Sequence, residues 1–326
     1  YEPQLWRMGA CRPTVDGTIV GFEKKGKDTY ALIDTSDIHT LMVAAAGTGK
    51  TTFFLEPNIE YCCATGMSFI STDTKGDIYR NCGYVAAKRY GYKISVIDLR
   101  NPLKSDGFNL LHLVKKYMDE YKNDPMDISA KAKSERYAKI VADSIIATDG
   151  DKYGANTYFY DAAKGLIAAL ILIIAEYGND NECHIVSVLK LMIELLEAKP
   201  QKKSQLKSET YFADLIKLLP PDHKARWLSG AAINNADQAA LSVVSTALSR
   251  LNSLIDTETE QILCFNTAID TETLCNEKCA VFIVLPEEDR TKYVIANLII
   301  EQISREIYHI ADENGGHLDK RIMIYF

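Results

Sequence analysis

The stretch L-M-V-A-A-A-G-T-G-K-T-T, residues 41–52, constrains the fold more than any other part of the sequence. Its apolar first half, residues 41–46, predicts a buried strand. Gly47 and Gly49 predict a sharp turn, and a helical pattern begins at Lys50. A strand, a glycine-rich turn and a helix start in this order are the setting of a phosphate-binding loop. Glycines let the backbone curl so that successive N–H groups point at phosphate oxygens, and the helix N-terminus adds partial positive charge.

This loop predicts a role for each of its residues. Lys50 would reach the β- and γ-phosphates of ATP, and the Thr51 hydroxyl would be a ligand of Mg²⁺. Ala44 stands where the pattern G-x-x-x-x-G-K-[ST] has its first glycine, and alanine is small enough for that position. The alternative is an ordinary glycine turn before a helix. The predicted nucleotide-binding residues are Ala45, Ala46, Gly47, Thr48, Gly49, Lys50, Thr51 and Thr52.

The bulk composition limits the class of protein. The chain has 326 residues, of which 47% are hydrophobic and 25% charged, so it can form one large α/β domain with an insertion, or two domains. A net charge of -7 is unusual for a free-standing nucleic-acid-binding protein, although a local basic channel is compatible with it. The longest apolar run, residues 165–175, is too short to span a bilayer. Because the chain begins at Tyr1 without a methionine, we expect it to be a fragment.

The first third of the chain alternates between strand and helix patterns. Short β-type runs in residues 1–35 precede the loop. The helix after the loop is predicted to run from Lys50 to about Tyr61, with Pro57 kinking or ending its regular part. Further strands are predicted at residues 67–72 and 93–97. This β-α-β-α-β order predicts a parallel sheet with right-handed crossovers, whose ligands bind beyond the carboxyl ends of the strands.

The middle of the chain has helical periodicity and almost no strand signal. Helices are predicted at residues 131–146, 159–177, 185–196 and 237–254. Polar connectors separate them, among them the lysine-rich residues 199–207, which could contact nucleic acid but read more simply as a solvated loop.

Strand patterns return at residues 280–285 and 321–326, with a long amphipathic helix between them. The sequence therefore predicts an α/β fold with a P-loop nucleotide-binding domain and a parallel central sheet, interrupted by an all-α insertion domain. The predicted parts are residues 1–111 for the first half of the nucleotide-binding domain, 112–263 for the insertion, and 264–326 for the second half.

A P-loop hydrolase also needs an apolar strand that ends in an acidic residue, which helps to hold Mg²⁺. Asp73 ends the strand after the P-loop helix and is predicted to support catalysis. The apolar residues 322–326 read as a second such strand, so we expect Asp-Glu to follow Phe326 in the native protein. A GTPase is disfavoured because the D-x-x-G and T-K-G-D patterns overlap within the five residues from Asp73 to Asp77.

Six segments carry a resemblance to the cytoplasmic ATPase domain of type IV secretion coupling proteins, the TraG/TraD family of conjugation ATPases. Two departures are visible, because Thr74 and Leu110 stand where that family usually has proline. The segments, in chain order, are A-A-G-T-G-K-T-T (45–52), D-T-K-G-D-I-Y (73–79), F-N-L-L (108–111), Y-F-Y-D-A-A (158–163), V-F-I-V-L-P (281–286) and R-I-M-I-Y-F (321–326).

The resemblance implies a RecA-like motor domain that forms a hexameric ring on the cytoplasmic side of the bacterial cell membrane. N-terminal transmembrane helices that are absent from this chain would anchor the ring. ATP-driven handling of a relaxase–single-stranded DNA substrate at the type IV secretion channel is the implied activity. In such a ring a neighbouring subunit would supply an arginine to the γ-phosphate, with Arg250 and Arg290 as candidates by location.

Two other functions remain open at this level. One is a nucleotide-dependent docking module that recruits the relaxosome or protein effectors with little hydrolysis, which the acidic net charge favours. The other is a translocase of the FtsK/HerA kind that acts on duplex DNA. Stimulation of ATP turnover by single-stranded DNA would distinguish a motor from a docking module.

Overall fold

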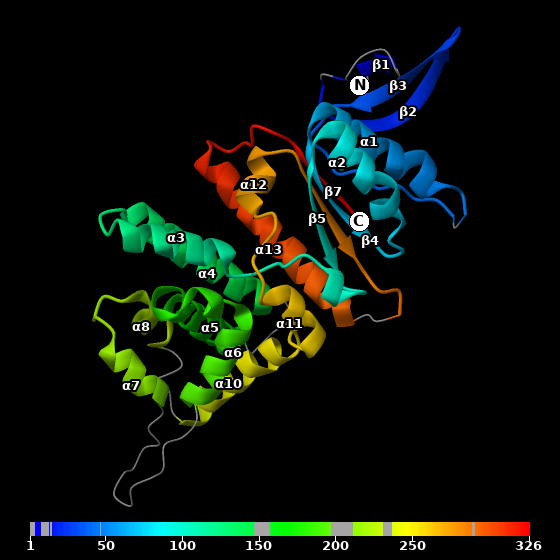
Figure 1. Cartoon of the computed structure of the whole chain (residues 1–326). Helices are drawn as coiled ribbons and strands as arrows, with labels where there is room; N and C mark the ends of the chain where they lie inside the picture. Colours follow the sequence, from blue (N-terminus) through cyan, green and yellow to red (C-terminus); the bar gives the residue numbers. More distant parts are fainter. Residues whose placement is uncertain are drawn as a thin grey trace, which may run out of the picture. The chain divides into compact units, whose positions relative to one another are not determined.

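The computed structural model describes residues 4–7, 13, 15–45, 47–146, 157–196, 211–230, 237–288 and 291–326 (Figure 1). Contacts divide the chain into two compact units. The parallel-sheet unit comprises Tyr1–Asn101, Ile269–Asp289 and His309–Phe326, and the helical unit comprises Pro102–Ala268 and Arg290–Tyr308. The predicted domain boundaries, after residue 111 and after residue 263, stay a prediction. The lysine-rich connector at 199–207 lies outside the described residues.

A four-stranded parallel sheet organises the first unit. Its strands are β4 (Ser68–Asp73), β5 (Lys93–Asp98), β6 (Cys279–Val284) and β7 (Ile322–Tyr325), in the spatial order β5-β6-β4-β7. The register pairs Val284 of β6 with Asp73 of β4 on one side and with Asp98 of β5 on the other. The last residues of β4 and β5 are therefore two aspartates that flank β6 at the carboxyl edge of the sheet. Every residue of β6 is buried, as expected for a central strand of a parallel sheet. The sheet confirms the predicted α/β fold class.

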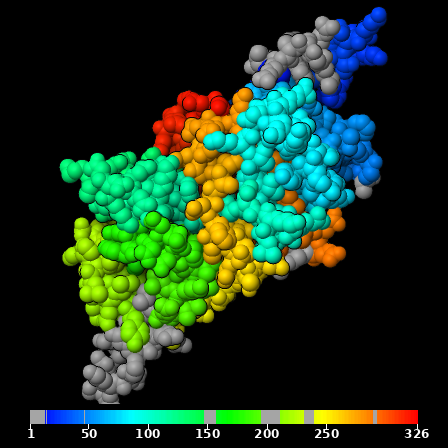
Figure 2. Space-filling view, viewed as in Figure 1, coloured from blue at the N-terminus to red at the C-terminus, as the bar shows by residue number. Residues whose placement is uncertain are grey.

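Two helices pack beside each other and against the strands of this sheet. Helix α1 (Glu56–Thr65) contacts β4, and α2 (Tyr84–Tyr90) contacts β5. A π-helical turn precedes each of them, η1 (Lys50–Leu55) before α1 and η2 (Tyr79–Gly83) before α2. The space-filling view shows α2, in cyan, on the surface of the unit (Figure 2).

The prediction that Pro57 ends the helix was wrong, because this proline lies in the first turn of α1. The helix continues to Thr65 and ends at Gly66, which has a φ of 93°. Proline is tolerated in the first turn of an α-helix.

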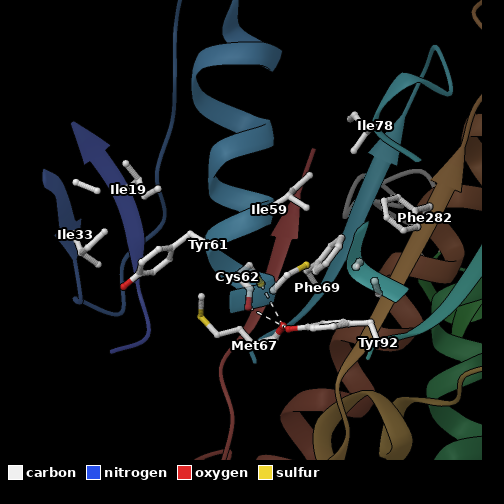
Figure 3. Close-up of a cluster of buried hydrophobic side chains, with 14 residues drawn as sticks. Ile19, Ile33, Ile59, Tyr61, Cys62, Met67, Phe69, Ile78, Tyr92 and Phe282 are labelled. Atoms are coloured by element: carbon white, nitrogen blue, oxygen red, sulfur yellow. Dashed lines mark hydrogen bonds between the residues drawn. The ribbon is translucent and has the colours of Figure 1, made fainter. Parts of the chain in front are cut away.

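A small antiparallel sheet lies before the loop in the sequence. It consists of β1 (Gln4–Arg7), β2 (Thr18–Lys25) and β3 (Asp28–Asp34), in the order β1-β3-β2. Figure 3 shows that α1 lies between this small sheet and the parallel sheet. Ile19 and Ile33 of the small sheet and Phe69 of β4 belong to one buried cluster with Ile59 and other α1 residues. The core of this unit therefore forms around the helix that follows the loop.

The helical unit is built around α5 (Thr157–Tyr177), of which twelve residues are buried. By length and composition this helix could cross a membrane, but 67% of its most apolar window is buried by the protein itself. That burial is typical of a core helix. The other helices of the unit are α3 (His112–Asn123), α4 (Ile128–Ile146), α6 (Ile185–Leu196), α7 (Tyr211–Leu218), α8 (Lys224–Leu228), α10 (Asp237–Asn252) and α11 (Thr257–Leu263).

Four predicted helices correspond to α4, α5, α6 and α10, with ends that differ by no more than about three residues. Helix α12 (Thr271–Asn276) belongs to the parallel-sheet unit. The long helix α13 (Thr291–Glu313) begins in the helical unit and ends in the parallel-sheet unit, so the contact-based boundary at Tyr308 falls inside it.

Candidate nucleotide-binding site

The loop before η1 is shaped by two glycines in the left-handed region of backbone conformation. Gly47 has a φ of 77° and Gly49 a φ of 85°, which side chains other than glycine rarely adopt. A Cβ at position 49 would also lie 2.4 Å from the ring of Phe53. The Thr48 hydroxyl donates to the carbonyl of Ala45 at 2.8 Å, which closes the loop on itself. The predicted turn is therefore present.

The side chain of Lys50 folds back over this loop. Its ammonium donates to the carbonyl oxygens of Ala44 at 2.8 Å and Ala45 at 2.9 Å. These are neutral acceptors, whereas phosphate oxygens carry charge and form stronger bonds with an ammonium. The lysine is therefore held at the loop by bonds that an anion can replace.

The helix start after the loop is irregular. In η1 the Glu56 N–H donates to the carbonyl of Thr51, a bond to the fifth residue back that defines a π-helical turn. Thr51 and Thr52 are both exposed in this turn. Such turns occur often at functional sites, because they widen the helix and redirect the side chains around them.

The buried strand predicted for residues 41–46 was wrong for the described part, residues 41–45. These residues form no strand, and the side chains of Leu41 and Val43 are 88% and 84% exposed. A strand requires a partner for its backbone groups, and the described parallel sheet contains only β4, β5, β6 and β7. Ala46, one of the predicted nucleotide-binding residues, lies outside the described residues.

Asp73, at the end of β4, is only 2% exposed and its carboxylate is used by the backbone that follows. One oxygen accepts from the N–H groups of Lys75 at 3.1 Å and Gly76 at 2.7 Å, and the other accepts from Tyr79 N–H at 3.0 Å. Arg100 donates to the carbonyl of Lys75 at 3.0 Å and fastens the same loop from the end of β5. The contacts present are those of a turn and helix cap. The supporting catalytic role of Asp73 stays a prediction.

Only one of the two candidate trans arginines lies among the described residues. Arg250 lies on α10, and its guanidinium is 5.7 Å from the ring centre of Tyr160 in the same unit. Arg290 lies outside the described residues. A trans role for either residue stays a prediction.

A cavity of about 260 Å³ lies beside α1 and α2 and includes Thr52 of the loop signature in its wall. Burial raises the pKa of both thiols in its wall, Cys63 and Cys82, to about 12. These thiols are therefore protonated at neutral pH and are poor nucleophiles. Within the described ranges, no three His, Cys, Asp or Glu side chains are arranged to hold a metal ion.

Sequence reasoning missed two residues that shape this site, Arg100 and Asn58. Asn58 lies on the buried face of α1 and bonds to the carbonyl of Phe54 in η1 and to the backbone of Ile19 in β2. An asparagine among the apolar positions of a helix was the available signal, because a buried amide must find partners. The sequence carried no comparable signal for Arg100.

Comparison with known proteins gives a family match and a shared fold. The family model described as "Type IV secretory system Conjugative DNA transfer" matches residues 9–325. No curated protein matches the chain. Among solved structures, the plasmid coupling protein TrwB in complex with the non-hydrolysable GTP analogue GDPNP has 11% sequence identity and a TM-score of 0.52, with 87% of this chain and 55% of that chain covered.

A second similar structure is the unbound bacterial conjugative coupling protein TrwBdeltaN70, with 11% identity, a TM-score of 0.49, and coverage of 86% of this chain and 52% of that chain. The chain thus spans about half the length of the solved structures that it matches. At this identity the likeness shows the fold alone, and it agrees with the predicted RecA-like P-loop fold. Because the family model covers nearly the whole sequence, the chain belongs to the type IV secretory system conjugative DNA transfer family.

Proposed function

We propose that this chain is the ATP-hydrolysing part of a coupling protein that delivers a relaxase–single-stranded DNA or protein substrate to a type IV secretion channel. Membership of the conjugative DNA transfer family supports a coupling role in DNA transfer. The observation that carries the nucleotide part is the position of Lys50, whose ammonium lies over a glycine-shaped loop at a helix start.

In the proposed site, Lys50 exchanges the carbonyls of Ala44 and Ala45 for the β- and γ-phosphate oxygens. The N–H groups of the loop and of the first helical turn donate to the same phosphates. Thr51 is exposed in that turn, and its hydroxyl is a hard oxygen ligand of the kind that Mg²⁺ prefers. A bound Mg²⁺ would neutralise charge on the phosphates.

The assembly and location follow from the same proposal. Subunits form a hexameric ring on the cytoplasmic side of the membrane, and the transfer system to which they belong is membrane-associated. Arg250 or Arg290 of one subunit reaches the γ-phosphate bound by the next, because a ring uses head-to-tail interfaces. Asp73 supports the loop beside the phosphates.

A docking module with little hydrolysis is the second candidate, favoured by the net charge of -7. DNA repels an acidic surface, whereas protein partners such as a relaxase can complement it. This candidate shares the nucleotide site and differs in turnover, so the two functions are separated by kinetics.

The first experiment measures binding of MgATP to the chain by calorimetry. Lys50→Ala should abolish measurable binding, because it removes a charge-assisted bond worth about 1.5–3 kcal/mol and the main positive charge of the loop. Lys88→Ala, at an exposed lysine of α2, is the matched control and should bind like the unaltered chain. Equal binding by the Lys50 and Lys88 variants would refute the proposed site.

A second experiment measures ATP turnover by a form of the protein that continues past Phe326, with and without single-stranded DNA. A motor should show turnover that needs Lys50, rises with DNA and loses this stimulation as salt increases. Binding through Lys50 with background turnover under all conditions would instead favour the docking module. A non-acidic pair after Phe326 would contradict the prediction for the missing acid.

A further inference from the structure

Asn58 makes a set of contacts that joins the start of the P-loop helix to the small antiparallel sheet. It lies on α1 with an exposed fraction of 2%. Its side-chain amide accepts from the Ile19 N–H at 2.7 Å and donates to the Ile19 carbonyl at 3.2 Å. Since β2 is an edge strand of the described small sheet, the amide takes the place of a strand at this edge, as in one rung of a ladder.

The remaining bond of Asn58 reaches toward the loop. Its Nδ2 donates to the carbonyl of Phe54 at 2.9 Å, within the π-helical turn that carries Lys50 and Thr51. The backbone bonding is irregular here, because in η1 the Glu56 N–H bonds to the fifth residue back, Thr51. A buried side-chain donor therefore stabilises the carbonyl of a turn whose own backbone bonds are irregular.

A second bond between α1 and the residues that precede β2 comes one turn later. The Tyr61 hydroxyl donates to the carbonyl of Val15 at 2.6 Å. Figure 3 shows Tyr61 and Ile59 on different sides of α1, with Tyr61 turned to the small sheet where Ile19 and Ile33 lie. Tyr61 thus holds the same helix to the same part of the chain, through a hydroxyl bond that does not involve the Phe54 carbonyl.

We infer that Asn58 is a positioning residue for the phosphate-binding loop: by bonding Ile19 and Phe54 together, it fixes the turn that carries Lys50 and Thr51 against the small sheet. This inference rests on the proposed nucleotide binding. Donors that bind phosphate must hold their places to within about 0.5 Å, so a turn with an irregular ladder benefits from an outside support. The small sheet thereby helps to set the geometry of the phosphate-binding loop.

The test compares Asn58→Ala with Tyr61→Phe. Both variants remove hydrogen bonds between α1 and residues in or before β2, but only the first releases the Phe54 carbonyl. We expect the Asn58 variant to bind a fluorescent ATP analogue with Mg²⁺ about tenfold more weakly, and the Tyr61 variant to stay within about twofold of the unaltered chain. Binding is measured at a temperature at which circular dichroism shows each variant folded.

Hydrogen exchange of the backbone amides of residues 50–55, without nucleotide, gives a second readout. Exchange should become faster in Asn58→Ala and stay unchanged in Tyr61→Phe, because only the first variant loosens the turn. If Asn58→Ala does not fold, Asn58→Asp keeps the side-chain size and the oxygen that faces the Ile19 N–H while removing the amide donor.

Each outcome decides the question. Unchanged affinity in both Asn58 variants, or equal weakening in Tyr61→Phe, overturns the inference while the proposed function stands. Absence of binding by the unaltered chain overturns the proposed function and this inference together. Weaker binding with faster exchange, confined to the Asn58 variants, supports it.

Discussion

Substitution of Asp73 separates a structural cap from a catalytic carboxylate. In Asp73→Asn, the remaining oxygen can still accept from Lys75 and Gly76, but the amide nitrogen faces the Tyr79 N–H and that bond is lost. We expect a loss of about 2 kcal/mol in the free energy of unfolding, since the Tyr79 N–H loses its partner and the other bonds lose their charge assistance. Asp73→Ala loses all three bonds, and we expect about 4 kcal/mol.

Urea unfolding measures the free energy, and hydrogen exchange at the Gly76 and Tyr79 amides shows that the change is local. The opposite result has a clear meaning. The contrary outcome is that Asp73→Ala unfolds at the same urea concentration as the unaltered chain, or a higher one, while ATP turnover is lost. In that case the hydrogen bonds of the Asp73 carboxylate to the backbone do not contribute measurably to stability. Active sites commonly trade stability for function, so that result would favour the catalytic role.

Two further predictions concern the helical unit. Gly165→Ala in α5 should destabilise the chain by about 1–3 kcal/mol, measured by urea unfolding, because the new Cβ would lie 2.5 Å from the backbone carbonyl oxygen of Leu228. This clash should outweigh the higher helix propensity of alanine. Equal or greater stability of the variant would show that α8 can shift to accommodate the methyl group. The hydrogen bond from His223 lowers the pKa of the Glu176 carboxyl, so its stabilisation is present above the ordinary pKa of a glutamate and is lost as pH falls through the lowered value. Glu176→Gln should therefore cost about 1 kcal/mol near pH 7 and progressively less as the pH falls through the lowered pKa, and a cost that is independent of pH would contradict this linkage.

Much of the fold could be predicted because its elements carry local signals. Strand β6 is an apolar run, β4 and β5 are short segments with apolar residues that end in aspartate, and helices such as α6 are predominantly apolar over three turns. Residues 41–45 are an apolar run like β6, yet they form no strand. An apolar run specifies burial in general, whereas a strand needs a neighbour with free backbone groups, and that neighbour is chosen by the tertiary structure.

The phosphate-binding loop could be predicted from the sequence, but the residues that hold it and the neighbouring turn in place could not. Gly47, Gly49 and Lys50 form a motif whose chemistry depends on residues next to one another in the chain. Asn58 and Arg100 act on backbone groups 39 and 25 residues away, and nothing at those positions in the sequence indicates the partner. Asp73 was identified by its place after a strand, but its partners are the backbone N–H groups that follow it.

The order of the strands in the parallel sheet has a consequence for how the protein is made. Strands β4 and β5 are neighbours in the sequence, but β6 lies between them in the sheet and β7 completes the other side of β4. The Ser68 hydroxyl, at the start of β4, bonds to a carbonyl 209 residues later, at Glu277. During synthesis, the continuous part of the helical unit leaves the ribosome before β4 can acquire either neighbour. Until β6 and β7 are synthesised, the apolar faces and backbone edges of β4 and β5 therefore stay exposed. We expect this topology to make folding slow and dependent on chaperones.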